Sequence, residues 1–396
     1  MSKYVTQVRI LEHQLQLLLV FNRSPLCLLF SLLLASLILS SVTVGQAQSI
    51  VNFTEYTIPT PRSGLHDAVS DSNGHIWYTG QYSNKVGVLD PSTAQFQEFV
   101  VPTSDFGPHG LTIAPGDIPW FTGVSSGKIG KLIPSTGMIT EFTVPTPQCS
   151  PHTLRFDSGG RLWFTEETGN KVGYFDPSKQ SFEEFTIPTP RSTPYGLDID
   201  NQGQVWFAEL SGSKIGLANQ ASGVTAEFPI PTVGGGSRRV AIDRSGKVWF
   251  TEFFASKIGV FDPGKKTFQE WETPTKDAGT YAIVIDGHGL IWFSEYKANN
   301  VAYLNPTTGI IRELPLQTPH SNIRFMSLHP DGRVIYAASG SDIIGLISNE
   351  ESTQITQTRL QEENQTFSIP EALLLTTTVG VLAALFFLRR RRNQHN

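Results

Sequence analysis

Polar and ionisable side chains recur along the chain at intervals of 43 residues, in step with a series of tryptophans. Eleven residues before each tryptophan position the sequence has His66, His109, His152, Tyr195, Arg238, Tyr281 and Arg324. Neutral imidazoles act as general bases near pH 7, and arginines compensate carboxylates. Because equivalent positions of a repeat occupy equivalent places in the fold, this series predicts one ring of functional side chains.

A second series stands three residues after each tryptophan and consists mainly of glutamates. The first two copies have Gly80 and Gly123 there, and the next four have Glu166, Glu209, Glu252 and Glu295. The third copy doubles its carboxylate with Glu167 and carries His152 in a Pro-His pair, as the preceding copy does with His109. Two imidazoles and two carboxylates from neighbouring copies could hold a hard divalent cation and supply a general base.

The repeat itself predicts the elements that carry these residues. Six tryptophans are spaced by 43 residues, namely Trp77, Trp120, Trp163, Trp206, Trp249 and Trp292, and a seventh copy continues at Val334-Ile335-Tyr336. Each copy contains an apolar stretch, a Trp-Phe stretch, a Lys-Ile-Gly stretch and a Glu-Phe stretch, with Asp-x-x-Gly turns between the first two. Four short strands per 40 to 45 residues are typical of a propeller blade. We therefore expect an all-β, seven-bladed β-propeller over residues 51–351; a right-handed β-helix, whose coils are shorter, is the alternative.

Both polar series flank the same predicted hairpin, so they should meet at one rim of the propeller. The ring of His, Tyr and Arg would then lie beside an arc of four glutamates at the mouth of the central channel. In the alternative interpretation, these polar groups are solvated, or the glutamates bind backbone amides. A surplus Glu-Phe stretch at 52–59 resembles 181–188 and could pair as the outer strand of the last blade, which would close the ring.

The two ends of the chain predict export and a membrane anchor. Residues 1–47 contain a basic segment, an apolar run and a small-residue stretch, as in a signal peptide, although an uncleaved N-terminal membrane segment is also possible. A polar linker at 352–371 leads into a 17-residue apolar run at 372–388, and the tail at 389–396 begins with four arginines. We interpret the run as a transmembrane helix with a cytoplasmic tail rather than as a buried core helix. A sorting signal that is removed by an exosortase-like enzyme remains an alternative.

Composition narrows the class of partner. The chain has a net charge of −5, which becomes about −11 when residues 1–47 and the four terminal arginines are set aside. Such an acidic body disfavours nucleic acid and suits an exported protein or a cation site. Outside the leader the one cysteine is Cys149, which excludes an intrachain disulfide in the body. We expect a monomeric propeller at the cell surface, held through its C-terminal helix.

The Pro-His-Gly, Trp-Phe-Thr-Glu, Lys-Ile-Gly and Glu-Phe-x-Ile-Pro-Thr-Pro motifs, at this period, resemble the virginiamycin B lyase (streptogramin lyase) family of propellers. The resemblance implies a Mg²⁺-dependent elimination that opens a cyclic depsipeptide at its ester, with His152 as the base, His109 beside it and Glu166 or Glu167 at the metal. The family places its histidine pair in the last two blades, where this chain has Tyr281 and Arg324. Ser150 replaces the family's glutamate before the base.

Two functions are compatible with these observations. One is a carbon-oxygen lyase that acts outside the cell on a small cyclic depsipeptide or lactone ester. The other is a non-catalytic surface propeller that binds a glycan, a peptide or an envelope protein.

Overall fold

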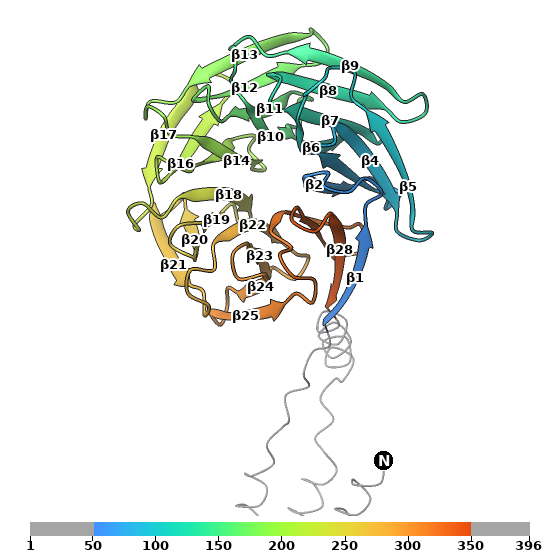
Figure 1. Ribbon diagram of the computed structural model, residues 1–396. Helices are drawn as coiled ribbons and strands as arrows, with labels where there is room; N and C mark the ends of the chain where they lie inside the picture. Colours follow the sequence, from blue (N-terminus) through green and yellow to red (C-terminus); the bar gives the residue numbers. More distant parts are fainter. Residues whose placement is uncertain (1–50, 350–396) are drawn as a thin grey trace, which may run out of the picture. The chain divides into compact units, whose positions relative to one another are not determined.

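Residues 51–349 are described by the computed structural model, and every helix or strand among them is a β-strand (Figure 1). The predicted leader at 1–47, the linker at 352–371, the transmembrane helix at 372–388 and the tail at 389–396 lie outside the described residues. Within 51–349 no helix is long and apolar enough to cross a membrane.

The strands form seven four-stranded antiparallel sheets arranged in a ring, which confirms the predicted seven-bladed propeller (Figure 1). The innermost strands are β2 (Leu65–Ser70), β6 (Pro108–Ala114), β10 (Pro151–Phe156), β14 (Pro194–Ile199), β18 (Ser237–Ile242), β22 (Thr280–Ile285) and β26 (Ile323–Leu328). The second strands are β3 (Ile76–Gly80), β7 (Ile118–Gly123), β11 (Leu162–Glu166), β15 (Val205–Glu209), β19 (Val248–Glu252), β23 (Ile291–Glu295) and β27 (Val334–Ala338). The third strands are β4 (Lys85–Asp90), β8 (Lys128–Ile133), β12 (Lys171–Asp176), β16 (Lys214–Asn219), β20 (Lys257–Asp262), β24 (Asn300–Asn305) and β28 (Ile343–Asn349). The outer strands are β5 (Gln95–Val100), β9 (Met138–Thr143), β13 (Ser181–Thr186), β17 (Gly223–Pro229), β21 (Thr267–Glu272), β25 (Ile310–Pro315) and β1 (Val51–Thr57).

The ring is closed by its first strand. Strand β1 pairs antiparallel with β28, so that Phe53 lies opposite Ile347 and Thr57 lies opposite Ile343. The last blade therefore takes its outer strand from the N-terminal end of the propeller, as the surplus Glu-Phe stretch predicts. This arrangement covers the edge of β28 and gives the last blade four strands like the others.

The repeated tryptophan is fixed to the turn that precedes it. In blade three the indole Nε1–H of Trp163 donates to Asp157 Oδ2 at 3.0 Å, and the backbone N–H of Gly159 donates to Asp157 Oδ1 at 2.9 Å. The turn ends at Gly160, whose φ of 78° is in the left-handed region that favours glycine. Trp163 itself packs against Leu197 and Phe207 of the next blade, so the core lies between successive blades.

In several blades a threonine hydroxyl on the second strand donates a hydrogen bond to the inner strand of the following blade. Thr79 Oγ1 donates to the carbonyl of His109 at 2.6 Å, and Thr122 Oγ1 donates to the carbonyl of His152 at 2.7 Å. The Thr in the repeated Trp-Phe-Thr motif thus sets the position of the polar residue in the neighbouring blade.

Candidate active site

The seven polar residues of the first series lie on the inner strands, and six of them form a continuous set of ring and guanidinium contacts around the propeller axis. The ring centroids of His66 and His109 are 3.4 Å apart, those of His109 and His152 are 4.1 Å apart, and those of His152 and Tyr195 are 3.7 Å apart. Arg238 and Tyr281 continue the set. The sequence therefore predicts correctly that these residues meet, although they are spread over blades that begin 43 residues apart.

A β-bulge near the start of the inner strand aims these side chains at the axis. In blade three Pro151 pairs with Glu166 and Leu154 pairs with Phe164, so three steps on β10 face two steps on β11. His152 and Thr153 are the residues between these two pairs. Bulges of this kind redirect side chains beside functional sites. The other six inner strands show a register shift at the equivalent place.

The three histidines are buried and poor in hydrogen-bond partners. His66, His109 and His152 are 0%, 5% and 1% exposed. Burial, with the charges of nearby arginines as a further contribution, lowers the pKa of His66 and His152 well below the usual value, and burial and His66 do the same for His109. All three imidazoles are therefore neutral at pH 7, with lone pairs available on their rings.

Residues that follow the histidines by one position orient two of the rings. Asp67 Oδ1 lies 2.8 Å from His66 Nδ1, and Thr153 Oγ1 lies 3.1 Å from His152 Nδ1. A carboxylate only accepts, so His66 Nδ1 carries the proton and His66 Nε2 holds the lone pair. Neither partner was predicted from the sequence. The residue directly after each ring position differs from copy to copy, and this variation was the signal that could have identified them.

Arg239 crosses the axis and joins these two partners. Its Nη1 donates to Thr153 Oγ1 at 2.9 Å, and its Nη2 lies 3.5 Å from Asp67 Oδ1. Burial raises the pKa of Asp67, while the charge of Arg239 opposes that rise. The ion pair therefore favours the ionised form of Asp67 beside the buried histidines, against the effect of burial.

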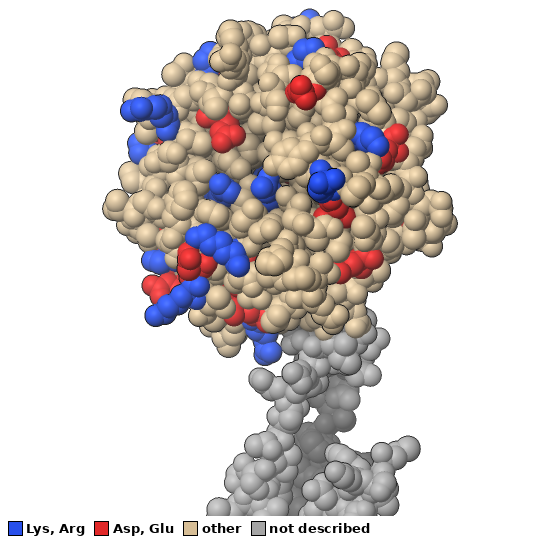
Figure 2. Space-filling view, viewed as in Figure 1, with Lys and Arg blue, Asp and Glu red and all other residues tan. Residues whose placement is uncertain are grey.

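The opposite half of the ring is aromatic and cationic. The guanidinium of Arg238 lies 4.6 Å from the ring centre of Tyr195, 4.3 Å from that of Phe253 and 4.1 Å from that of Tyr281. Arg324 lies 5.9 Å from the ring centre of Tyr296. Lys and Arg side chains also gather near the centre of the face shown in Figure 2. This half of the ring can receive an aromatic or anionic group.

The four glutamates of the second series do not form an arc at the axis, and this corrects the sequence-based expectation. Glu166, Glu209, Glu252 and Glu295 are at most 1% exposed, and each interacts with a glutamate on the outer strand of its own blade, namely Glu184, Glu227, Glu270 and Glu313. Each of them pairs with the first residue of the inner strand, but its side chain faces the glutamate on the outer strand of its own blade.

Each of these glutamates holds a proton near neutral pH. Burial, reinforced by the charge of Glu184, raises the pKa of Glu166 to about 8. Glu166 interacts with the carboxyl group of Glu184, and two carboxyl groups can hydrogen-bond to each other only when one of them carries a proton. Lys171 binds the partner, with its Nζ 3.1 Å from Glu184 Oε2.

Glu167 is separated from Glu166 and lies with the ring residues. It is partly exposed, burial raises its pKa, and the charge of Arg238 lowers it. Glu167 stands four residues after Trp163. The equivalent residues of the next three blades are Leu210, Phe253 and Tyr296. These three side chains belong to, or pack against, the cluster that contains Tyr195 and Tyr281. The histidines predicted to lie together do meet, Glu167 interacts with Arg238 of the same ring, and Glu166 lies apart from both inside its blade.

The residues predicted to hold Mg²⁺ do not gather into an oxygen-rich site. Within 51–349 the one group of three or more potential ligands is His66, His109 and His152, which offers nitrogen atoms. Mg²⁺ prefers oxygen in near-octahedral geometry. Glu166 faces another carboxyl in its blade, so it does not fit the predicted ligand role. The Mg²⁺ requirement remains a prediction.

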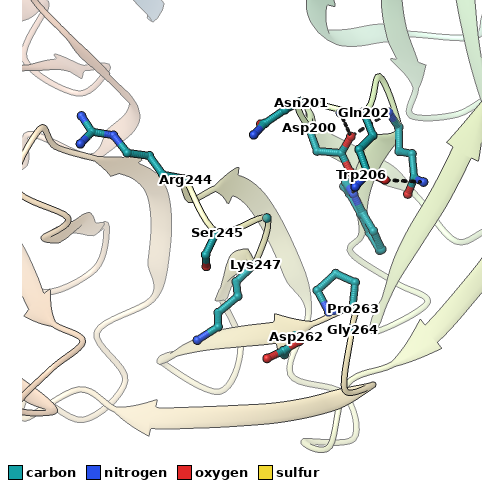
Figure 3. A pocket seen from close by; sticks show the side chains of 12 residues that line it. Asp200, Asn201, Gln202, Trp206, Arg244, Ser245, Lys247, Asp262, Pro263 and Gly264 are labelled. Carbon is teal, nitrogen blue, oxygen red and sulfur yellow. Dashed lines mark hydrogen bonds between the residues drawn. The ribbon is translucent and has the colours of Figure 1, made fainter.

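A separate hollow of about 510 Å³ lies between blades four and five, at the ends of the inner strands away from the histidines. Figure 3 shows its lining, which comes mainly from turns, with Asp200, Arg244 and Lys247, and also includes Asp262 at the end of β20. Its walls combine charged and amide side chains with Trp206 and Pro263, and none of the predicted site residues lines it.

The fold and the axial ring define a seven-bladed propeller with a histidine-containing site at one end of its axis. The family model described as the virginiamycin B lyase family matches residues 38–278, and the chain belongs to this family. No curated protein sequence matched the chain.

Solved structures of this family are similar to the chain over the whole propeller. Selenomethionine-substituted virginiamycin B lyase from Staphylococcus aureus is 26% identical with a TM-score of 0.71, and the alignment covers 76% of this chain and 99% of that one. A streptogramin B lyase structure is 28% identical with a TM-score of 0.71, covering 76% and 98%. A catalytically inactive S. aureus variant, with one histidine replaced by alanine and with quinupristin present, is 26% identical with a TM-score of 0.71, covering 76% and 99%.

Proposed function

We propose that the chain is a carbon-oxygen lyase that opens small cyclic depsipeptides or lactones at an ester, with His152 as the general base. The observation that carries this proposal is the group of three buried, neutral histidines at the axis of a virginiamycin B lyase family propeller. The loss of activity in the S. aureus variant that lacks one histidine is consistent with a histidine base in this family.

The proposed reaction is an elimination. His152 takes a proton from the carbon next to the carbon that carries the ester oxygen; a carbon-carbon double bond forms, the carbon-oxygen bond breaks, and the carboxylate leaves. If His152 Nδ1–H donates to Thr153 Oγ1, the lone pair on Nε2 is free to accept the proton. Arg238, surrounded by three aromatic rings, would bind the departing carboxylate.

The burial of the histidines sets a condition on this reaction. A substrate reaches His152, which is 1% exposed, only when neighbouring side chains move. Arg238 and Glu167 are partly exposed, and the charge of Arg238 acts on both His152 and Glu167. We infer that an ester substrate displaces them, and that Arg238 then faces the ester.

Mass spectrometry of the product tests the reaction class. Elimination leaves the mass of an opened ring unchanged, whereas hydrolysis adds the mass of one water. We expect wild-type protein to open a streptogramin B-type depsipeptide without a change in mass, and His152→Ala to have no turnover. His288→Ala is the matched control, because His288 is exposed on a turn between β22 and β23. Equal turnover by wild type and His152→Ala would refute the base.

Absence of turnover across a panel of cyclic esters, together with measurable binding of a surface ligand, would favour the non-catalytic propeller instead. We further propose an exported, monomeric protein that is anchored at the cell surface by residues 372–388. Protease digestion of intact cells tests this: the propeller should be cleaved or released from the outside, and protection of the propeller would contradict the proposal.

A further inference from the structure

Three histidines from consecutive blades converge at the propeller axis in a way that their packing does not explain. One ring nitrogen of each of His66, His109 and His152 lies within 4.8 Å of one ring nitrogen of the other two. His66 Nε2, His109 Nδ1 and His152 Nε2 are buried and have no hydrogen-bond partner. Buried polar atoms without partners are costly, so three of them in one place indicate a missing ligand.

The neighbours of these rings are those that metal-binding histidines commonly have. His66 Nδ1–H donates to Asp67 Oδ1 at 2.8 Å, and the other oxygen of Asp67 accepts the backbone N–H of Leu111 at 3.1 Å. His152 Nδ1 lies 3.1 Å from Thr153 Oγ1. A carboxylate behind a histidine fixes the ring and its tautomer, and it leaves the far nitrogen ready to bind a metal.

We propose that His66, His109 and His152 form a three-histidine site for a divalent transition-metal ion of the Zn²⁺, Co²⁺ or Ni²⁺ type. Three imidazole nitrogens suit these ions and do not suit Mg²⁺ or Ca²⁺. Three protein ligands also leave a coordination position open for water or for a ligand.

The geometry requires only a small adjustment of the rings. Metal-nitrogen bonds of about 2.0 to 2.1 Å place tetrahedral ligand nitrogens about 3.4 Å apart. The nitrogens here lie within 4.8 Å, and the adjacent rings are splayed by 31° and 59° rather than parallel. Rotation of the rings about their side-chain bonds would therefore bring the three nitrogens to one ion.

The charges around the site oppose a cation in part. Arg238, Arg239 and Arg324 act on His66, and Asp67 is the carboxylate that compensates them. We therefore expect Asp67→Asn to weaken metal binding by about tenfold or more, as removal of a carboxylate behind a ligand does elsewhere.

This site does not depend on the proposed lyase activity. A metal on His152 Nε2 would occupy the lone pair that the elimination uses, so Zn²⁺ should inhibit turnover if both proposals hold. Metal binding without turnover would leave the site standing and refute the lyase, and turnover without metal binding would do the reverse.

Calorimetry tests the site directly. The full-length chain, made without a histidine tag and stripped with a chelator, should bind Zn²⁺ or Ni²⁺ one to one in the presence of excess Mg²⁺. Bound Co²⁺ should show visible absorption bands from coordinated nitrogen. His66→Asn, His109→Asn and His152→Asn should each weaken binding by about tenfold or more. His288→Asn should bind as wild type does, since it lies outside the cluster.

Circular dichroism of each variant shows whether it is folded, and any variant that fails to fold is replaced by the Gln substitution. No binding by wild type, or equal binding by wild type and folded variants of all three histidines, would overturn the proposal.

Discussion

The hydroxyls of Tyr195 and Tyr281, which come from blades four and six, lie 2.8 Å apart beside the propeller axis. Blade five contributes Arg238, whose guanidinium packs on both phenol rings. The contact joins two blades that are not neighbours, so it ties the inner strands together across the ring.

Loss of one of these hydroxyls should destabilise the propeller. We expect Tyr195→Phe or Tyr281→Phe to lower the free energy of unfolding by about 1 to 2 kcal/mol, because the remaining buried hydroxyl loses its partner. The double variant should lose less than the sum of the two single variants, which gives a coupling energy of about 1 kcal/mol in denaturant titrations. Strict additivity would contradict the hydrogen bond.

The carboxyl pairs inside blades three to six should make the propeller less stable as the pH rises. The pKa of Glu166 rises from 4.5 to about 8, and Glu209, Glu252 and Glu295 are also raised to about 8. Between 4.5 and 8 the folded chain holds protons that the unfolded chain has lost, so the free energy of unfolding falls with increasing pH. Thermal melts between about pH 6.5 and pH 9 should show the decrease.

Glu166→Gln isolates one of these pairs, because the amide resembles the protonated acid. We expect the variant to have a smaller pH dependence than wild type, with most of its gain above pH 8. Glu141→Gln is the matched control in blade two, where Gly123 replaces the second glutamate and Glu141 pairs with Lys128 at 2.8 Å. A wild-type melting temperature that is constant over this range would contradict the assignment.

Removal of the closing strand should open the ring. Deletion of residues 48–60 removes β1 and exposes the edge of β28, which is paired to it along seven residues. We expect a large drop in melting temperature and a tendency to associate through the exposed edge, measured by calorimetry and by light scattering. Phe53→Ala, a milder change at the same place, should lower stability without association. Unchanged stability of the deletion variant would contradict closure by β1.

Substitution of a tryptophan on the second strand of a blade should cost more stability than substitution of a tryptophan on an outer strand. Trp163→Ala should cost about 3 to 5 kcal/mol of unfolding free energy, because Trp163 is 1% exposed and donates to Asp157. Trp271, on the outer strand β21, is partly buried, so Trp271→Ala should cost less. Denaturant titrations measure both values. Equal costs would show that Trp163 contributes no more to packing than Trp271 does.

The fold could be predicted because the repeat encodes it locally. Each copy carries its own strand pattern, its Asp-x-x-Gly turn and its tryptophan, so one correct interpretation applies to every blade. The surplus strand at 52–59 was predictable for the same reason, and its pairing with β28 confirms it. The ring of His, Tyr and Arg followed from equal offsets in the repeat, since equal offsets place residues at equal heights around one axis.

Side-chain direction within a blade could not be predicted. His152 and Glu166 belong to neighbouring strands at the same rim, yet the bulge between Pro151 and Leu154 turns His152 to the axis while Glu166 stays inside the blade. A bulge has no distinct signal in this repeat, because it depends on how two strands pair. Periodic offsets alone therefore placed Glu166 incorrectly with the histidines.

The sequence by itself determined the number of blades, the strand order and the set of residues that surround the axis, since all of these follow from one local pattern repeated at a fixed period. The tertiary structure alone decided which residues meet across the axis. Arg239 of blade five contacts Thr153 of blade three and Asp67 of blade one. Tyr195 contacts Tyr281 over a separation of 86 residues. Such contacts exist only after the ring has closed, because closure, and not any local preference, brings the inner strands of distant blades to one axis.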